Sequence, residues 1–134
     1  MKVRFDTAEL DTLLSKVDGI EDDVISKITP VFRTEINKIA IESRGKVPVK
    51  SGNLQNSMST KISSSAAKLS GIIEFGGGVV SDYASIQHEN EIFSHASGKQ
   101  AHWLYGDDNS AYEKNEDLLI GRIEKEIYSV LEKL

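Results

Sequence analysis

Three histidines and their acidic neighbours are the residues of this sequence whose types and spacing could support chemistry. His88, His95 and His102 follow one another at intervals of seven residues. Imidazole nitrogens, together with a carboxylate such as that of Glu89, can hold Zn²⁺ and leave one position open for a water molecule. Such a site would define a small metal-dependent hydrolase, which we keep as an alternative hypothesis.

The segment around these histidines argues against a metal site. A seven-residue interval aligns side chains on a helix, but the segment contains Ser94, Ser97 and Gly98 and shows no helical stripe of apolar residues. In a loop the interval carries no geometric meaning, so structural or solvated histidines are the simpler interpretation. We therefore predict no metal, no cofactor and no catalytic residue.

The rest of the chain lacks the common catalytic signatures. It contains no Gly-x-Ser-x-Gly, no His-Glu-x-x-His and no phosphate-binding loop. Three consecutive glycines, Gly76 to Gly78, precede neither a lysine–serine pair nor a helical start, so they predict a turn. The chain has no cysteine, which excludes a disulfide framework, a thiolate metal site and a cysteine nucleophile. We predict that the protein is not an enzyme.

The length and composition predict one domain that spans residues 1–134. A chain of 134 residues buries roughly two thirds of its unfolded surface and needs no disulfide bond or metal ion to fold. It has neither the apolar N-terminal segment of a signal peptide nor an apolar run long enough to cross a membrane. We expect a soluble protein without a membrane partner, and the lack of cysteine fits a reducing cytoplasm.

Two helical patterns occupy the first third of the chain. Asp6, with Glu9 three residues later, predicts the start of a first helix that ends at Gly19. A second pattern covers residues 21–44, and Pro30 within it either starts a fresh helix or kinks a continuous one. We expect the part after Pro30 to be the long central helix.

The middle of the chain predicts short strands. Partial alternation over residues 54–65, 69–75 and 79–87, with a loop at 63–67, indicates a three-stranded, mainly antiparallel meander. Residues 90–115 show no clear period, and we expect them to form a mobile loop.

The last segment, residues 114–134, carries apolar residues at helical spacing. These residues are Leu118, Leu119, Ile123, Ile127, Val130, Leu131 and Leu134. We interpret the stripe as the core-facing side of a C-terminal helix. The predicted fold class is α+β, with N-terminal helices that include one long central helix, a small mainly antiparallel sheet of three or four strands, and the C-terminal helix.

A corner between helix and sheet is predicted where the long helix ends. Pro48 fixes its own φ and keeps Val47 out of the α region, so the preceding helix must stop. Gly45 can supply the stop in the left-handed conformation. Arg44 and Lys46 then lie near the negative end of the helix dipole.

The stretch after this corner carries the most recognisable pattern of the sequence. Ser51 and Gly52 predict a turn, and Leu54 returns the chain to the core. The run has the form Pro-x-(Lys/Asp/Arg)-(Ser/Thr)-Gly-x-Leu-x-x-Ser, followed by a strand with Tyr-Ala and an acidic residue. The matching residues are Pro48, Lys50, Ser51, Gly52, Leu54, Ser57, Tyr83, Ala84 and Glu89. This pattern resembles the head-tail joining family of tailed bacteriophages, also called tail-component or minor capsid proteins.

The resemblance implies a non-enzymatic structural component of the phage neck, which joins heads to tails or completes the tail. It implies a ring-like homo-oligomer whose partners are the neck, connector and tail proteins. The protein would occupy the host bacterial cytoplasm during assembly and then the virion neck. A standalone bacterial binding or regulatory module is a further alternative, beside the metal-dependent hydrolase.

The net charge of −5 conceals a polarity along the chain. Residues 43–73 contain no acidic residue and have a charge of +5, whereas residues 1–42 carry −3 and residues 74–134 carry −7. The five cations of the middle segment are Arg44, Lys46, Lys50, Lys61 and Lys68. If the two signs occupy different surfaces, the positive side of one subunit can meet the negative side of its neighbour, head to tail. Arg44, Lys46 and Lys50 are our basic candidates for such contacts.

Two other interpretations of these charges remain open. A scatter of solvated charges would produce the same totals. Contact with DNA is a third interpretation, although five spaced cations without interleaved aromatic residues are a weak footprint for it.

Aromatic residues of the loop are the remaining interaction candidates. Phe93, Trp103 and Tyr105 would mark a contact surface if they were exposed. The alternative is that Trp103 and Leu104 enter the domain and anchor the loop.

Overall fold

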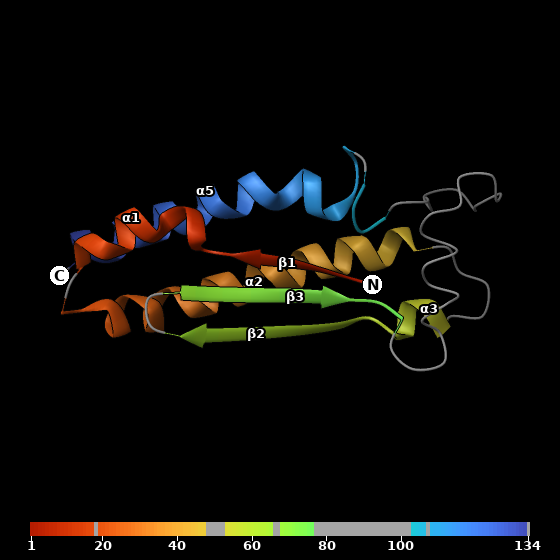
Figure 1. Ribbon diagram of the computed structural model, residues 1–134, viewed down its shortest axis with the longest axis horizontal. Helices are drawn as coiled ribbons and strands as arrows, with labels where there is room; N and C mark the ends of the chain where they lie inside the picture. The colour runs from red at the N-terminus through yellow and green to blue at the C-terminus, as the bar shows by residue number, and fades with distance from the viewer. Residues whose placement is uncertain (18, 48–52, 66–67, 77–102, 107, 134) are drawn as a thin grey trace.

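The computed structural model describes residues 1–17, 19–47, 53–65, 68–76, 103–106 and 108–133. The elements follow in the order β1 (Lys2–Asp6), η1 (Ala8–Leu10), α1 (Asp11–Leu14), η2 (Ser15–Val17), α2 (Glu21–Lys46), α3 (Asn53–Asn56), β2 (Ser59–Ser65), β3 (Lys68–Glu74) and α5 (Ala111–Glu132). The long α2, the antiparallel sheet and the C-terminal α5 confirm the predicted α+β class (Figure 1).

The three-stranded sheet has the order β1-β3-β2, and both strand pairs are antiparallel. Its central strand, β3, places Leu69, Gly71 and Ile73 toward the core, as the alternation predicts. The sequence interpretation missed β1, although Val3 and Phe5 alternate there with exposed residues. A five-residue strand is too short to stand out from the helix-start pattern beside it, and only its pairing with β3 defines it.

Two of the predicted strand boundaries need correction, and a third strand cannot be compared. Residues 53–56 form the short α3 instead of the first part of a strand. Residues 63–65 belong to β2 and not to a loop, because the ladder with β3 continues to the Ser65↔Lys68 pair. The strand predicted at residues 79–87 lies outside the described residues.

The second helical pattern is one continuous helix. α2 runs through Pro30 and ends at Lys46, so Pro30 lies inside a continuous helix and does not start a fresh one. The long helix begins at Glu21, which corrects the expectation that it is the part after Pro30. The predicted role of Gly45 is wrong, since among the described glycines only Gly19, Gly76 and Gly106 have positive φ. The helix instead ends at Lys46, and the C-cap residue Val47 has an extended φ of −65° and ψ of 131°, as the proline after it requires.

The first helical segment is an irregular series of short turns. It comprises η1, α1 and η2, and a Gly19 with φ of 88° follows it, as predicted. The Asp6 carboxylate accepts a hydrogen bond from the Ala8 N–H at 3.0 Å, so this side chain does support the start of the segment. Leu10 and Leu14 are its buried residues.

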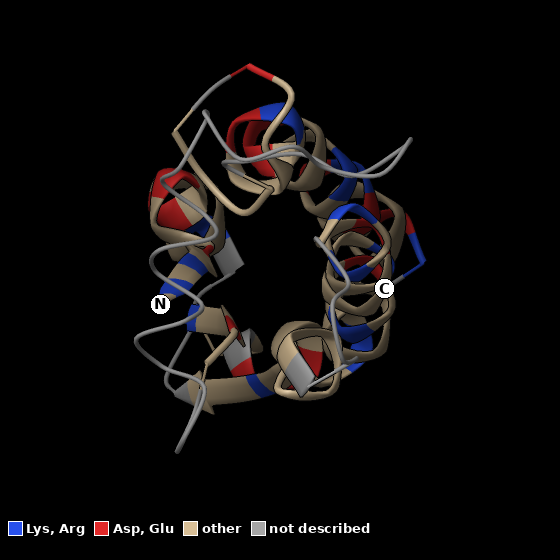
Figure 2. Ribbon diagram, turned by 90° about the vertical axis from the view of Figure 1, so that its right-hand side faces the viewer, with Lys and Arg blue, Asp and Glu red and all other residues tan. Residues whose placement is uncertain are grey.

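The core lies between the sheet and the long helices. In the end-on view of Figure 2 the sheet, α2 and α5 surround a common interior, which side chains from all of them fill. Gly71 of β3 lies directly under α2, where an added Cβ would come within 2.8 Å of Ile36 Cγ1 and 3.2 Å of Phe32 Cε1. The glycine therefore sets how closely α2 approaches the sheet.

Candidate protein-interaction surfaces

The predicted corner joins the end of α2 to α3 through hydrogen bonds of side chains to both backbone and side-chain atoms. The Arg44 guanidinium donates to the Gln55 carbonyl oxygen at 3.3 Å and to Asn56 Oδ1 at 3.1 Å. Gln55 Nε2 donates in return to the Arg44 carbonyl oxygen at 3.2 Å, and the same oxygen accepts from the Val47 N–H at 3.3 Å at the helix end. Arg44 remains exposed while it makes these contacts.

The later half of the motif contains Leu54 and Ser57, and each of them has a defined role in the structure. Ser57 Oγ donates to the Leu54 carbonyl oxygen at 2.6 Å and accepts from the Gly76 N–H at 2.9 Å. The Leu54 side chain is only 2% exposed. Together the two residues fasten the corner to the end of β3.

The other motif residues cannot be placed. Pro48, Lys50, Ser51 and Gly52 lie outside the described residues, as do Tyr83 and Ala84. The turn predicted for Ser51 and Gly52 and the interaction role predicted for Lys50 stay predictions.

The Lys46 side chain is mostly buried and binds neighbouring segments of the corner. Its ammonium donates to the Asn109 carbonyl oxygen at 3.0 Å and lies 3.5 Å from the Glu42 carboxylate. The side chain is 20% exposed. Lys46 therefore joins α2 to the segment before α5, and Arg44 is the better placed of the two for a partner.

Trp103 and Leu104 are anchors, not exposed contacts. Both are fully buried, and the Trp103 ring packs edge-on to Phe75 with centroids 6.0 Å apart. Their carbonyl oxygens accept from the N–H groups of Ala111 at 3.0 Å and Tyr112 at 2.8 Å, so this segment also caps the first turn of α5. Of the three aromatic candidates, Tyr105 is exposed and Phe93 lies outside the described residues.

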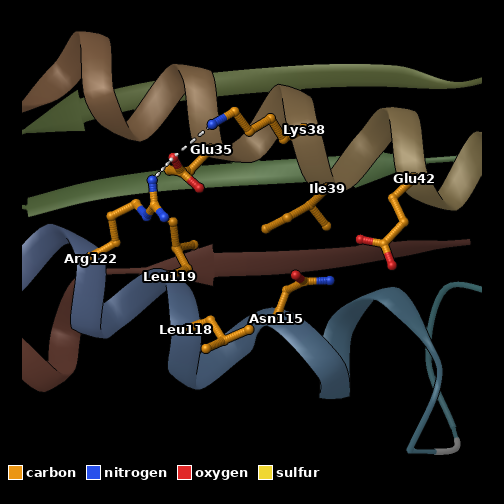
Figure 3. A pocket seen from close by; sticks show the side chains of 8 residues that line it. All are labelled: Glu35, Lys38, Ile39, Glu42, Asn115, Leu118, Leu119 and Arg122. Carbon is orange, nitrogen blue, oxygen red and sulfur yellow. Dashed lines mark hydrogen bonds and ion pairs between the residues drawn. The ribbon is translucent and has the colours of Figure 1, made fainter.

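A surface groove runs between α2 and α5, which pack against each other. It has a volume of about 320 Å³ and is lined by Glu35, Lys38, Ile39, Glu42, Asn115, Leu118, Leu119 and Arg122. Figure 3 shows Ile39 and Leu119 between the two helices, with charged side chains toward the two ends. Because residues 35 and 42 of α2 pair with residues 122 and 114 of α5, the helices run antiparallel.

The carboxylates of Glu35 and Glu42 form ion pairs with the cations of this groove. Glu35 lies 3.2 Å from Arg122 and 3.5 Å from Lys38. Glu42 accepts a hydrogen bond from Lys114 at 2.7 Å. This hydrogen bond, against a smaller opposing effect of burial, holds the pKa of Glu42 below its ordinary value. The neighbouring cations Lys114 and Lys46 thus favour the ionised form of the Glu42 carboxylate.

The described residues offer no arrangement for metal catalysis. No group of three or more His, Cys, Asp or Glu side chains in these ranges could hold a metal ion. His88, His95 and His102 lie outside them, so the hydrolase stays a hypothesis.

Exposed apolar side chains on the two long helices were not predicted. Leu118 is 67% exposed, which corrects its assignment to the core-facing stripe of the last helix. Helical geometry explains the error, because Leu118 is turned by about 100° from the buried Leu119. Ile41 of α2 and Tyr128 of α5 are also exposed, by 68% and 49%.

Comparisons with protein-family models, with curated proteins and with solved structures found no match for this chain. Within the described ranges, no helix combines the length and the apolar character that a membrane span requires.

Proposed function

We propose that this protein is a non-enzymatic structural component of the neck of a tailed bacteriophage, where it joins heads to tails or completes the tail. The observation that carries the proposal is the corner built by Leu54 and Ser57. Both residues of the resembling motif have a defined physical task there, since one fills the core and the other bonds two separate backbone segments. This supports a structural role for these two motif residues in the fold.

The charge distribution supports an oligomer with head-to-tail contacts. The face of the sheet that points away from the core carries Lys2, Arg4, Lys61 and Lys68 beside Asp6 and Glu74. At its centre, Arg4 and Lys61 lie on either side of Ile72 in the strand register. This cationic sheet face is our candidate for the positive side of the contact.

The matching negative side would lie on α5 and the adjoining N-terminal turns. Exposed carboxylates in this region are Glu9, Asp11, Glu113, Asp117 and Glu124. The N-terminal turns and α5 are in contact, so these charges occupy neighbouring elements. Complementary faces of this kind steer association and fix its orientation.

Electron microscopy of lysates from a parent phage with this gene disrupted tests the proposed function. DNA-filled heads and finished tails lying unattached are the expected result. Infectious particles of normal appearance would contradict the joining role, and the regulatory module would then be the leading hypothesis.

A charge-reversed pair tests the contact surface. Arg4→Glu with Lys61→Glu, supplied in trans to the disrupted phage, should lower the yield of joined particles by about tenfold or more. Lys27→Glu with Arg33→Glu is the matched control, because both residues are exposed on α2 and the net charge changes equally. Lys46 is unsuitable for this test, since its replacement would also release Asn109. Equal yields from the two pairs would remove the sheet face from the contact.

A further inference from the structure

The side of α5 that faces away from the core carries a regular stripe of exposed residues. The stripe consists of Lys114, Leu118, Gly121, Lys125, Tyr128 and Glu132. Its intervals alternate between four and three residues, which is the spacing at which one helix faces another along its length.

Three observations show that the stripe is open to another molecule. Leu118 and Tyr128 expose 67% and 49% of their surface. Within the described part of the chain, Lys125, Tyr128 and Glu132 make no side-chain hydrogen bond or ion pair. A surface hollow of about 570 Å³, lined in part by Leu118, Gly121 and Lys125, lies at the middle of the stripe.

Gly121 has no internal reason to be glycine. It lies in the interior of a helix, where glycine is the poorest former after proline. A Cβ built on it would have no neighbour within 4 Å, and its φ is not positive. A glycine with open space above it allows the backbone or a long side chain of another molecule to approach closely.

The order of residues makes the stripe complementary to itself in the antiparallel direction. Reversing the stripe brings its first residue opposite its last, which pairs Lys114 with Glu132. The second then lies opposite the fifth, which pairs Leu118 with Tyr128. The two central positions pair Gly121 with Lys125, so that the aliphatic stem of the lysine covers the glycine.

The parallel direction is unfavourable for the same stripe. Each residue would then face its own copy, with Lys114, Lys125 and Glu132 in like-charge pairs. Like charges in direct opposition oppose association, so the sequence of charges selects the antiparallel arrangement.

From these features we propose that two copies of this chain associate through the α5 stripe, with the two helices antiparallel about a two-fold axis. The contact is isologous, because the same residues are used by both copies. Lys114 keeps its hydrogen bond to Glu42 at 2.7 Å while 49% of its side chain is exposed, so its ammonium can be shared with the partner's carboxylate. The pairing does not depend on the proposed function. It leaves the cationic sheet face free, and on α5 it uses residues other than Glu113, Asp117 and Glu124, the carboxylates assigned above to the head-to-tail contact.

One helix pair forms a small interface. We expect a weak dimer, with a dissociation constant on the order of tens to hundreds of micromolar. A contact of this strength is best detected by sedimentation over a range of concentrations and by cross-linking in a defined register.

Because the chain has no cysteine, disulfide trapping can test the register directly. Leu118→Cys and Tyr128→Cys chains are purified separately, and then oxidised alone or after mixing. The mixture should give several-fold more dimer than either chain alone, with one chain of each kind. In the antiparallel pairing two copies of position 118, or of position 128, lie about 15 Å apart along the axis, which is too far for a disulfide.

Ile41→Cys is the control for chance collisions, because Ile41 is as exposed as Leu118 but lies on α2. A mixture of Ile41→Cys with Tyr128→Cys should give only the background of cross-linked product. Equal yields in all mixtures, or efficient cross-linking of the single variants, would overturn the antiparallel α5 pair.

Sedimentation of the unmodified chain provides the second measurement. Dimer should increase with concentration, and Leu118→Glu should raise the dissociation constant by about tenfold. The control Ile41→Glu should leave it unchanged. A wild-type chain that stays monomeric at every accessible concentration would refute the proposal without bearing on the phage role, which the gene disruption tests separately.

Discussion

Two glycines occupy opposite regions of this molecule, one under α2 and one on the outer side of α5. A Cβ on Gly71 would collide with Ile36 at 2.8 Å, whereas a Cβ on Gly121 would meet nothing within 4 Å. The first glycine is explained by the packing of the chain itself. The second is not, because it lies on the exposed side of α5, where the packing of the chain sets no requirement for glycine.

The largest expected effect concerns the inner region. Trp103→Ala removes a fully buried ring and its edge-on contact with Phe75, and it should lower the free energy of unfolding by about 3–5 kcal/mol. Urea unfolding followed by far-UV circular dichroism measures this loss. Tyr105→Ala, at an exposed position two residues later, should cost little. Comparable losses for both variants would mean that Trp103 is not the anchor of this segment.

Gly71→Ala tests whether the sheet and α2 are in the close contact described above. We expect a loss of about 1–3 kcal/mol, because the Ile36 and Phe32 side chains must move to admit the methyl group. Unfolding can be followed by the fluorescence of the single tryptophan, which lies in the core. The control is Gly45→Ala, since a Cβ there meets no atom within 4 Å. A stable Gly71→Ala protein would contradict the steric explanation.

Ser57→Ala tests the fastening of the corner. The variant loses the hydrogen bond to Leu54 and leaves the Gly76 N–H without its acceptor. We expect a loss of about 1–2 kcal/mol in the free energy of unfolding. Ser64→Ala, at an exposed position of β2, provides the baseline in the same urea titration. If the two serine variants are equally stable, Ser57 does not hold the corner to β3.

Gly121→Ala should have the opposite sign from Gly71→Ala. Alanine favours the helix over glycine by about 0.5–1 kcal/mol, and no clash opposes it, so the monomer should become more stable. Thermal unfolding at low protein concentration measures this gain. A destabilised monomer would show that Gly121 has an internal role and would abolish the contrast between the two glycines.

The smallest effect concerns Glu42 in the groove. The pKa of Glu42 is lowered by the hydrogen bond from Lys114, so its contribution to stability is present above the ordinary value of 4.5 and is lost as pH falls through the lower folded value. Glu42→Gln should therefore cost about 0.5–1 kcal/mol at neutral pH. The difference from wild type should shrink below that ordinary value. Urea titrations at several pH values measure it, and a constant difference would assign the effect to packing instead of charge.

The helices show which structural features a local sequence pattern predicts and which it does not. The apolar spacing that predicts α5 also identifies its buried residues Leu119, Ile123 and Ile127, because helical periodicity is a property of neighbouring residues. It did not separate Leu118 from this stripe, because apolar type alone does not specify the direction of a side chain. The motif residues Leu54 and Ser57 were recognised as a group, but the acceptor role of Ser57 toward Gly76 depends on a residue 19 positions away.

The sequence by itself determined the α+β class, the long helix, the alternating strand β3 and the end of α2 before Pro48, since each depends on periodicity or on the covalent restriction of a proline. Only the tertiary structure decided that residues 2–6 form a strand, because β1 is stabilised by its pairing with β3 some seventy residues later. The same holds for Trp103, whose burial follows from the space that Phe75 and α5 leave for it. Contacts between distant segments select among conformations that the local sequence leaves nearly equal in free energy.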